Sequence, residues 1–152
     1  MSSFELHWSV KDSLIAYISG LEDGTVEALE PAARTESGFT FVLNEVAADF
    51  NADTHTGVLQ FLGTAHFTGH WGMMNITIKD PRVELTSGHG VLSIAQGGIL
   101  SPEVHVPFVN LNVIPGSHPL MLTAALTAEG RGVMGEQYSV GQKLSTVTLV
   151  DK

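Results

Sequence analysis

The chain has 152 residues, with 7 lysines and arginines against 16 aspartates and glutamates, which gives a formal net charge of −9. It contains no cysteine, so disulfides, thiolate-bound metals and cysteine nucleophiles are excluded. Nucleic acid and anionic lipid are poor partners for a chain of this charge without a basic cluster, because both bind by having their phosphates neutralised. The length and a hydrophobic content of 43% predict one domain over residues 1–152.

The first predicted element is a helix over residues 10–19. Apolar side chains recur there at the spacing of one helix face, at Val10, Leu14, Tyr17 and Ile18. Ser9 is the expected N-cap, Asp12 completes a capping box, and Gly20 ends the helix. Tyr17 is expected to point into the fold, where a buried phenol usually finds a hydrogen-bond partner such as a backbone carbonyl.

Most of the remaining chain is predicted to form short strands separated by glycine and proline turns. The expected strands cover residues 39–43, 58–61, 65–71, 75–79, 83–85, 91–94, 104–113, 120–127 and 143–150. Residues 22–37 are expected to form a weak strand and a surface loop. Many short strands at this spacing predict an antiparallel β-sandwich or barrel, so the fold class is mainly β with one short N-terminal helix.

Residues 130–135 fit the G-x-G-x-x-G pattern of dinucleotide-binding loops. That site requires a helix to open at the third glycine, so that backbone amides meet the pyrophosphate. The residues that follow show no amphipathic period and contain a further glycine, Gly141. We therefore expect a hairpin turn here instead of a nucleotide site.

The sequence shows no targeting or membrane-spanning segment. No stretch approaches 18 consecutive apolar residues, which a membrane helix would need. The first residues lack the basic and apolar regions of a signal peptide. Two locations remain open: a soluble cytoplasmic protein, or the mature part of a secreted or cell-envelope protein.

Two of the seven histidines, His66 and His70, have the H-x-x-x-H spacing that places two imidazoles on one metal in a helix. In the predicted strand over residues 65–71 they would be about 13 Å apart, so a shared zinc ion is not expected. A regular strand places these two side chains on one face. Phe67 and Trp71 would then lie on the opposite face.

Four sequence blocks, in order over residues 6–150, carry a resemblance to a known family. Residues 8–17 fit W-x-V-K-x-S-[FL]-x-x-Y and end at Tyr17, and residues 69–72 fit G-H-x-G before an apolar pair. Residues 80–83 fit [DN]-P-x-[VI], and residues 138–141 fit Y-x-x-G. With these blocks the chain resembles the HtaA domains of actinobacterial haem-uptake proteins.

The resemblance implies a β-rich domain that captures haem and passes it on. In that family a tyrosine from the first block holds the haem iron, and this position is Tyr17. A histidine from the G-H-x-G block, here His70, hydrogen-bonds to that tyrosine. A phenolate is a hard anionic ligand that favours Fe(III), so the implied cofactor is ferric haem b. Other haem-carrier proteins, or a second copy of the chain, are the implied partners.

A bound porphyrin also needs apolar surface. The candidates for that contact are Trp8, Phe67, Trp71, Met73 and Met74. A bulge at Gly69 or Gly72 would be needed for Trp71 to reach the haem face that His70 approaches. His66 is a further candidate, for a haem propionate or for the second axial position.

Two other functions stay open at this point. A haem-dependent, peroxidase-like enzyme would place an acid/base residue over the open iron face, for which His66 or His105 is available. A cofactor-free β-sandwich for adhesion or assembly would not bind haemin. A titration with haemin separates these alternatives.

Overall fold

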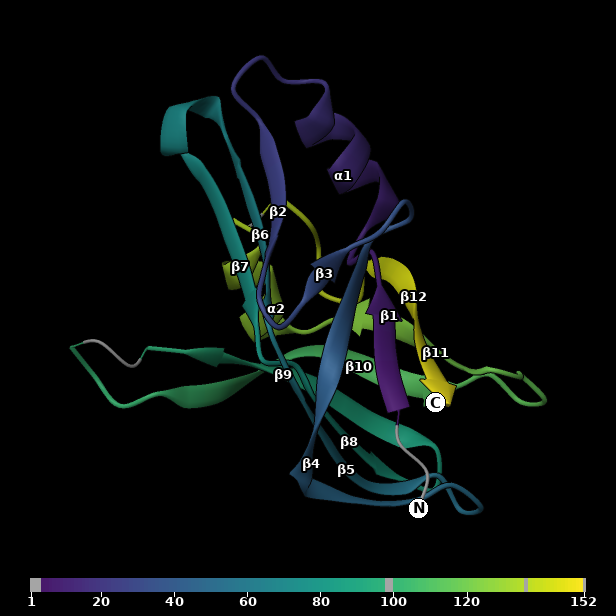
Figure 1. The fold of residues 1–152 in the computed structure, drawn as a ribbon. Coiled ribbons are helices and arrows are strands. Elements are labelled where there is room, and N and C mark those ends of the chain that lie inside the picture. The colour runs from purple at the N-terminus through teal and green to yellow at the C-terminus, as the bar shows by residue number, and fades with distance from the viewer. Residues whose placement is uncertain (1–3, 98–99, 136, 152) are drawn as a thin grey trace.

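The computed structural model describes residues 4–97, 100–135 and 137–151, which form a strand barrel with a smaller sheet rising from it (Figure 1). The strands are β1 (Phe4–Trp8), β2 (Thr25–Leu29), β3 (Ala33–Arg34), β4 (Phe39–Asn51), β5 (Thr56–Leu62), β6 (Thr64–Gly69), β7 (Met74–Lys79), β8 (Arg82–Thr86), β9 (His89–Gln96), β10 (Val104–Val113), β11 (Leu120–Leu126) and β12 (Lys143–Asp151). The helices are α1 (Asp12–Ser19), α2 (Ala128–Val133) and the 3-10 turn η1 (His70–Gly72). Within these residues, no helix is long and apolar enough to cross a membrane.

The large sheet closes into a barrel of eight strands. Its order is β1-β12-β11-β10-β9-β8-β5-β4-β3, and β1 also pairs with β4, so that β3 alone lies outside the closed ring. In β1, Leu6 is opposite Leu149 of β12 on one side and opposite Phe41 of β4 on the other. The pairings are antiparallel. This confirms the predicted mainly β, antiparallel fold and selects a barrel over a sandwich.

Alternate residues of each strand fill the core, because successive side chains point to opposite faces. Leu6 and Trp8 of β1 are buried, while His7 between them is partly exposed. The bulkiest fully buried side chains are phenylalanines: Phe39, Phe41, Phe61, Phe67 and Phe108. Phe39 of the barrel packs edge-on against Phe67 of the smaller sheet, with ring centroids 5.6 Å apart. One hydrophobic core therefore joins the two sheets.

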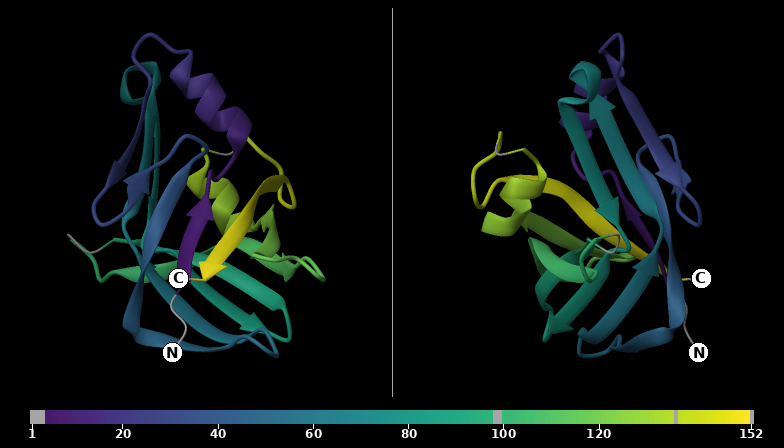
Figure 2. Two further views of the ribbon diagram at one scale, coloured as in Figure 1. Left: turned by 45° about the vertical axis from the view of Figure 1, so that its right-hand side comes forward. Right: turned by 90° about the vertical axis from the view of Figure 1, so that its left-hand side faces the viewer.

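The smaller sheet has the order β2-β6-β7 and rises away from the barrel at the end where α1 lies (Figure 2). Its burial alternates along β7: Met74, Ile76 and Ile78 are buried, whereas the residues between them are exposed. The predicted strand over 75–79 is thus confirmed. One face of this sheet continues the core, and the other is polar and solvent-exposed.

Helix α1 begins two residues later than predicted, at Asp12. Ser9 does not act as the N-cap, because Val10 has a left-handed φ of 66° and the chain turns before Lys11. The Ser9 hydroxyl instead donates a hydrogen bond to the Asp12 carboxylate, at 2.5 Å. Tyr17 does not point into the fold: it lies about 60° round the helix from Leu14, and half of its surface is exposed.

The predicted hairpin turn over residues 130–135 is wrong, because α2 covers most of this run. Thr127 caps the helix by accepting a hydrogen bond from the Gly130 amide at 2.8 Å. A Cβ at Gly130 would lie 2.2 Å from the carbonyl oxygen of Phe108. Glycine therefore allows α2 to approach β10 closely. The helix begins two residues before the first glycine of the pattern, whereas a dinucleotide-binding loop needs it to begin at the third glycine.

Candidate functional site

Tyr17 and His70 meet at the end of the smaller sheet. Tyr17 comes from α1 and His70 from the turn between β6 and β7, two elements that lie at the same end of the molecule (Figures 1 and 2). Their Oη and Nε2 atoms are 2.7 Å apart, although the residues are 53 positions apart in the sequence. The ring centroids are separated by 5.8 Å and the ring planes are inclined by 48°. An imidazole therefore takes the place of the expected backbone carbonyl as the partner of the phenol.

This hydrogen bond has two possible directions, set by the histidine tautomer. Either the phenol donates to Nε2, or the Nε2–H group donates to the phenol oxygen. The second arrangement also suits the deprotonated phenolate, whose oxygen accepts the N–H and keeps further lone pairs that can bind a metal. With half of the Tyr17 surface exposed, a large ligand can reach this oxygen from solvent.

A tight backbone turn presents His70 to Tyr17. Strand β6 ends at Gly69, and His70 and Trp71 then adopt left-handed conformations, with φ of 49° and 53°. Such a conformation costs about 1–2 kcal/mol for a residue with a Cβ, so surrounding contacts must hold it. The predicted strand over 65–71 is therefore two residues too long. The alternation expected for His70 and Trp71 does not apply, and this turn takes the place of a bulge.

The comparison with protein families decides what kind of domain this is. The HtaA family model matches residues 3–150, which is nearly the whole chain. The chain belongs to the HtaA family. No curated protein matches this HtaA domain by sequence.

Solved structures share the fold of this HtaA domain at low sequence identity. The C-terminal domain of HtaA from Corynebacterium glutamicum superposes with a TM-score of 0.79 at 20% identity, covering 97% of this chain and 96% of that chain. The N-terminal domain of the same protein gives 0.77 at 19% identity, covering 98% and 96%. Heme binding protein HtaB from the same organism gives 0.72 at 16% identity, covering 99% and 94%. These likenesses establish the fold.

Two of the apolar candidates lie at the surface of the HtaA domain, beside His70. Trp71 and Met73 are 82% and 91% exposed and belong to the β6–β7 turn or follow it directly. Met74, the next residue, begins β7 and is buried. Of the adjacent methionines, only Met73 therefore offers apolar surface beside the Tyr17–His70 pair.

The other two aromatic candidates are part of the core. The indole N–H of Trp8 donates to the carbonyl of Ser145 at 2.7 Å, and its ring packs edge-on against Phe108. Phe67 is fully buried against Phe39. Trp8, Phe67 and Met74 therefore fill the interior of the HtaA domain and offer little exposed surface, and their contact with a porphyrin stays a prediction.

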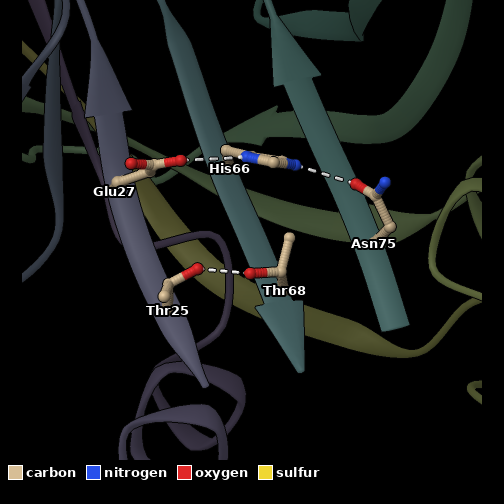
Figure 3. Close-up of polar contacts among 5 residues, drawn as sticks. All are labelled: Thr25, Glu27, His66, Thr68 and Asn75. Atoms are coloured by element: carbon tan, nitrogen blue, oxygen red, sulfur yellow. Dashed lines mark hydrogen bonds and ion pairs between the residues drawn. The ribbon is translucent and has the colours of Figure 1, made fainter. Parts of the chain in front are cut away.

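His66 lies on the polar face of the smaller sheet (Figure 3). Its Nδ1 is 3.2 Å from Glu27 Oε1 on β2, and its Nε2 is 2.8 Å from Asn75 Oδ1 on β7. Two residues nearer the turn, the hydroxyls of Thr25 and Thr68 are hydrogen-bonded to each other. Both ring nitrogens of His66 are engaged, so an axial or propionate contact would have to displace one of these bonds. The structure thus gives His66 a role in joining the three strands.

His105, the other candidate acid/base residue, lies on barrel strand β10. Its Nε2 atom is buried, and among the described residues it has no hydrogen-bond partner. No hydrogen bond among the described residues links His105 to Tyr17 or His70.

Of the predicted site residues, the structure therefore brings one pair together, Tyr17 and His70, with Trp71 and Met73 beside it.

Proposed function

We propose that this HtaA domain binds ferric haem b through the phenolate of Tyr17, with His70 donating a hydrogen bond to the ligating oxygen. The observation that carries the proposal is the 2.7 Å contact between an exposed phenol and an imidazole. Membership of the HtaA family, and the fold shared with heme binding protein HtaB, support haem as the ligand class. The domain would serve haem capture, storage or transfer.

The chemistry of the pair suits an oxidised iron. A free phenol loses its proton near pH 10, so binding at neutral pH needs factors that favour the anion. The positive charge of Fe(III) is one factor, and a hydrogen bond from an imidazole N–H is the other. Because a phenolate favours Fe(III) over Fe(II), reduction or a stronger acceptor would release the haem.

Titration with haemin tests this function. The proposal predicts a red complex with one haem per chain and a Soret band that saturates at that ratio. Peroxide turnover by the complex should stay near that of free haemin, because no acid/base side chain of the described residues is joined to the pair. A chain that stays colourless with added haemin would contradict the proposal, and turnover far above free haemin would favour the peroxidase-like alternative.

Removal of the hydrogen-bond donor should weaken haem retention without abolishing ligation. In His70→Ala the phenolate of Tyr17 loses its partner, and loss of such a supporting bond typically weakens metal binding by about 10–100-fold. The measurement is the rate of haem transfer to an excess of a high-affinity acceptor globin. His118→Ala, on the exposed β10–β11 loop, is the matched control and should transfer haem at the wild-type rate. A wild-type rate in His70→Ala would remove His70 from the site.

The exposed side chains beside the pair are proposed to cover part of the porphyrin. Trp71→Ala should raise the haemin dissociation constant about tenfold, equivalent to about 1.4 kcal/mol, because a large aromatic contact is lost. Met73→Ala should have a smaller effect in the same direction. Both side chains are exposed, so the thermal unfolding midpoint of the haem-free protein should hardly change. Unchanged affinity in both variants would place the porphyrin elsewhere.

A further inference from the structure

We infer that Asp23 is a positioning residue that holds the His70 turn against Tyr17. The inference rests on the proposed function, because it assigns Asp23 its effect through the hydrogen bond between these two side chains. Asp23 lies in the loop between α1 and β2 and is partly buried. It belongs to none of the sequence blocks that resemble the HtaA family.

The contact that carries the inference is made by the backbone of the turn. The amide N–H of Trp71 donates a hydrogen bond to the Asp23 carboxylate, across 48 positions of sequence. The β6–β7 ladder ends with the pairing of Gly69 and Met74, so it provides no partner for this amide. Asp23 therefore satisfies a donor that the left-handed turn leaves outside the sheet.

The carboxylate is well suited to stabilise this turn. His70 and Trp71 both occupy the left-handed region, which residues with a Cβ avoid. A hydrogen bond to an ionised acceptor is stronger than one to a neutral acceptor, so it favours the strained conformation more. Within the turn, the Met73 amide also donates to the carbonyl of His70 at 3.1 Å. Asp23 thus ties the backbone of the turn to the α1–β2 loop, in addition to the side-chain contact between His70 and Tyr17.

The loop that carries Asp23 is itself packed against α1 and against the end of β6, the two elements next to the site. A Cβ at Gly24 would lie 2.0 Å from the carbonyl oxygen of Ile18, so the loop folds tightly back on α1. A Cβ at Gly69 would lie 2.8 Å from Leu21 Cδ1, so the same loop also covers the end of β6. Because Tyr17 lies six residues before Asp23 on the same segment, the loop joins the helix of the phenol to the turn of the imidazole.

The test compares three variants of the full chain. Asp23→Ala removes the acceptor, Asp23→Asn keeps an acceptor oxygen without the charge, and Glu22→Ala removes a neighbouring exposed carboxylate. We expect haem transfer to an acceptor globin to be about tenfold faster in Asp23→Ala, less affected in Asp23→Asn and unchanged in Glu22→Ala. The iron–phenolate charge-transfer band of Asp23→Ala should move in the same direction as that of His70→Ala. Equal effects of Asp23→Ala and Glu22→Ala would overturn the inference.

A double variant separates positioning from general support of the fold. In the His70→Ala background, Asp23→Ala should change the transfer rate less than twofold, because its effect passes through His70. A full tenfold effect in that background would contradict the assignment. If Asp23→Ala does not fold, Asp23→Asn in the same two backgrounds gives the same comparison.

A measurement without haem keeps the inference distinct from the proposed function. In the haem-free protein, hydrogen exchange of the Trp71 amide should be at least about tenfold faster in Asp23→Ala than in the wild type, because the protecting bond is lost. Unchanged exchange would overturn the inference even if haemin binds. Failure of the wild-type chain to bind haemin would instead overturn the proposed function and leave the result for the turn standing.

Discussion

Tyr17→Phe is expected to abolish the iron–phenolate charge-transfer band and to raise the haemin dissociation constant on the order of 100-fold, equivalent to about 2.7 kcal/mol. The variant removes one oxygen atom, the proposed iron ligand, and keeps the ring. Because half of the Tyr17 surface is exposed, the stability of the haem-free fold should be nearly unchanged. Absorbance titration with haemin, together with thermal unfolding of the haem-free protein, measures both quantities.

Tyr138 provides the matched control, since the chain contains two tyrosines. Burial raises the pKa of the Tyr138 phenol, which disfavours the phenolate form that iron needs. Tyr138→Phe should therefore keep the charge-transfer band and the wild-type affinity. If the band survived in Tyr17→Phe and disappeared in Tyr138→Phe, the iron ligand would be Tyr138 and not Tyr17.

Phe67→Ala is expected to destabilise the fold by about 3–5 kcal/mol, because it empties a fully buried aromatic site. Phe67 packs against Phe39, and this contact joins the smaller sheet to the barrel. The free energy of unfolding from urea denaturation is the measurement. We expect this loss of unfolding free energy in the haem-free protein. A residue that only contacts a ligand would show no such loss when haem is absent.

Val46→Ala is the control for this prediction. Val46 is 99% exposed, so its truncation should change the free energy of unfolding by less than about 0.5 kcal/mol. A loss below about 1 kcal/mol in Phe67→Ala would mean that this ring does not join the two sheets. Such a result would favour a role of Phe67 as a porphyrin contact over a role in the core.

The strands were predictable because their signal is local. Short runs rich in strand-forming residues, separated by glycine and proline turns, predicted β7 to within one residue and β10 at both ends. Alternation along the first residues of the chain also carries a signal for Trp8. Trp8 and Leu6 are two residues apart on β1 and therefore share the face that points into the barrel.

The β6–β7 turn was not predictable from local pattern. Left-handed backbone is normally read from glycine, but here His70 and Trp71 adopt it before Gly72 is reached. The conformation is held by Asp23, whose contact with the turn spans 48 positions. A carboxylate in an acidic loop gives no sequence signal for such a contact.

The glycines of residues 130–135 were misinterpreted for a related reason. A glycine can serve a turn or a close approach between elements, and the sequence does not distinguish the two. At Gly130 the requirement is the approach of α2 to β10. The pairing of Tyr17 with His70, in contrast, was expected from the family resemblance and had no basis in local periodicity.

Resonance Raman spectroscopy of the haemin complex tests the central claim most directly. Tyrosine with a deuterated ring is incorporated into Tyr138→Phe, so that Tyr17 is the one labelled residue. With excitation in the charge-transfer band, we expect enhanced phenolate vibrations that shift on deuteration. A ferric complex without such vibrations, or with vibrations that do not shift, would show that Tyr17 is not the iron ligand.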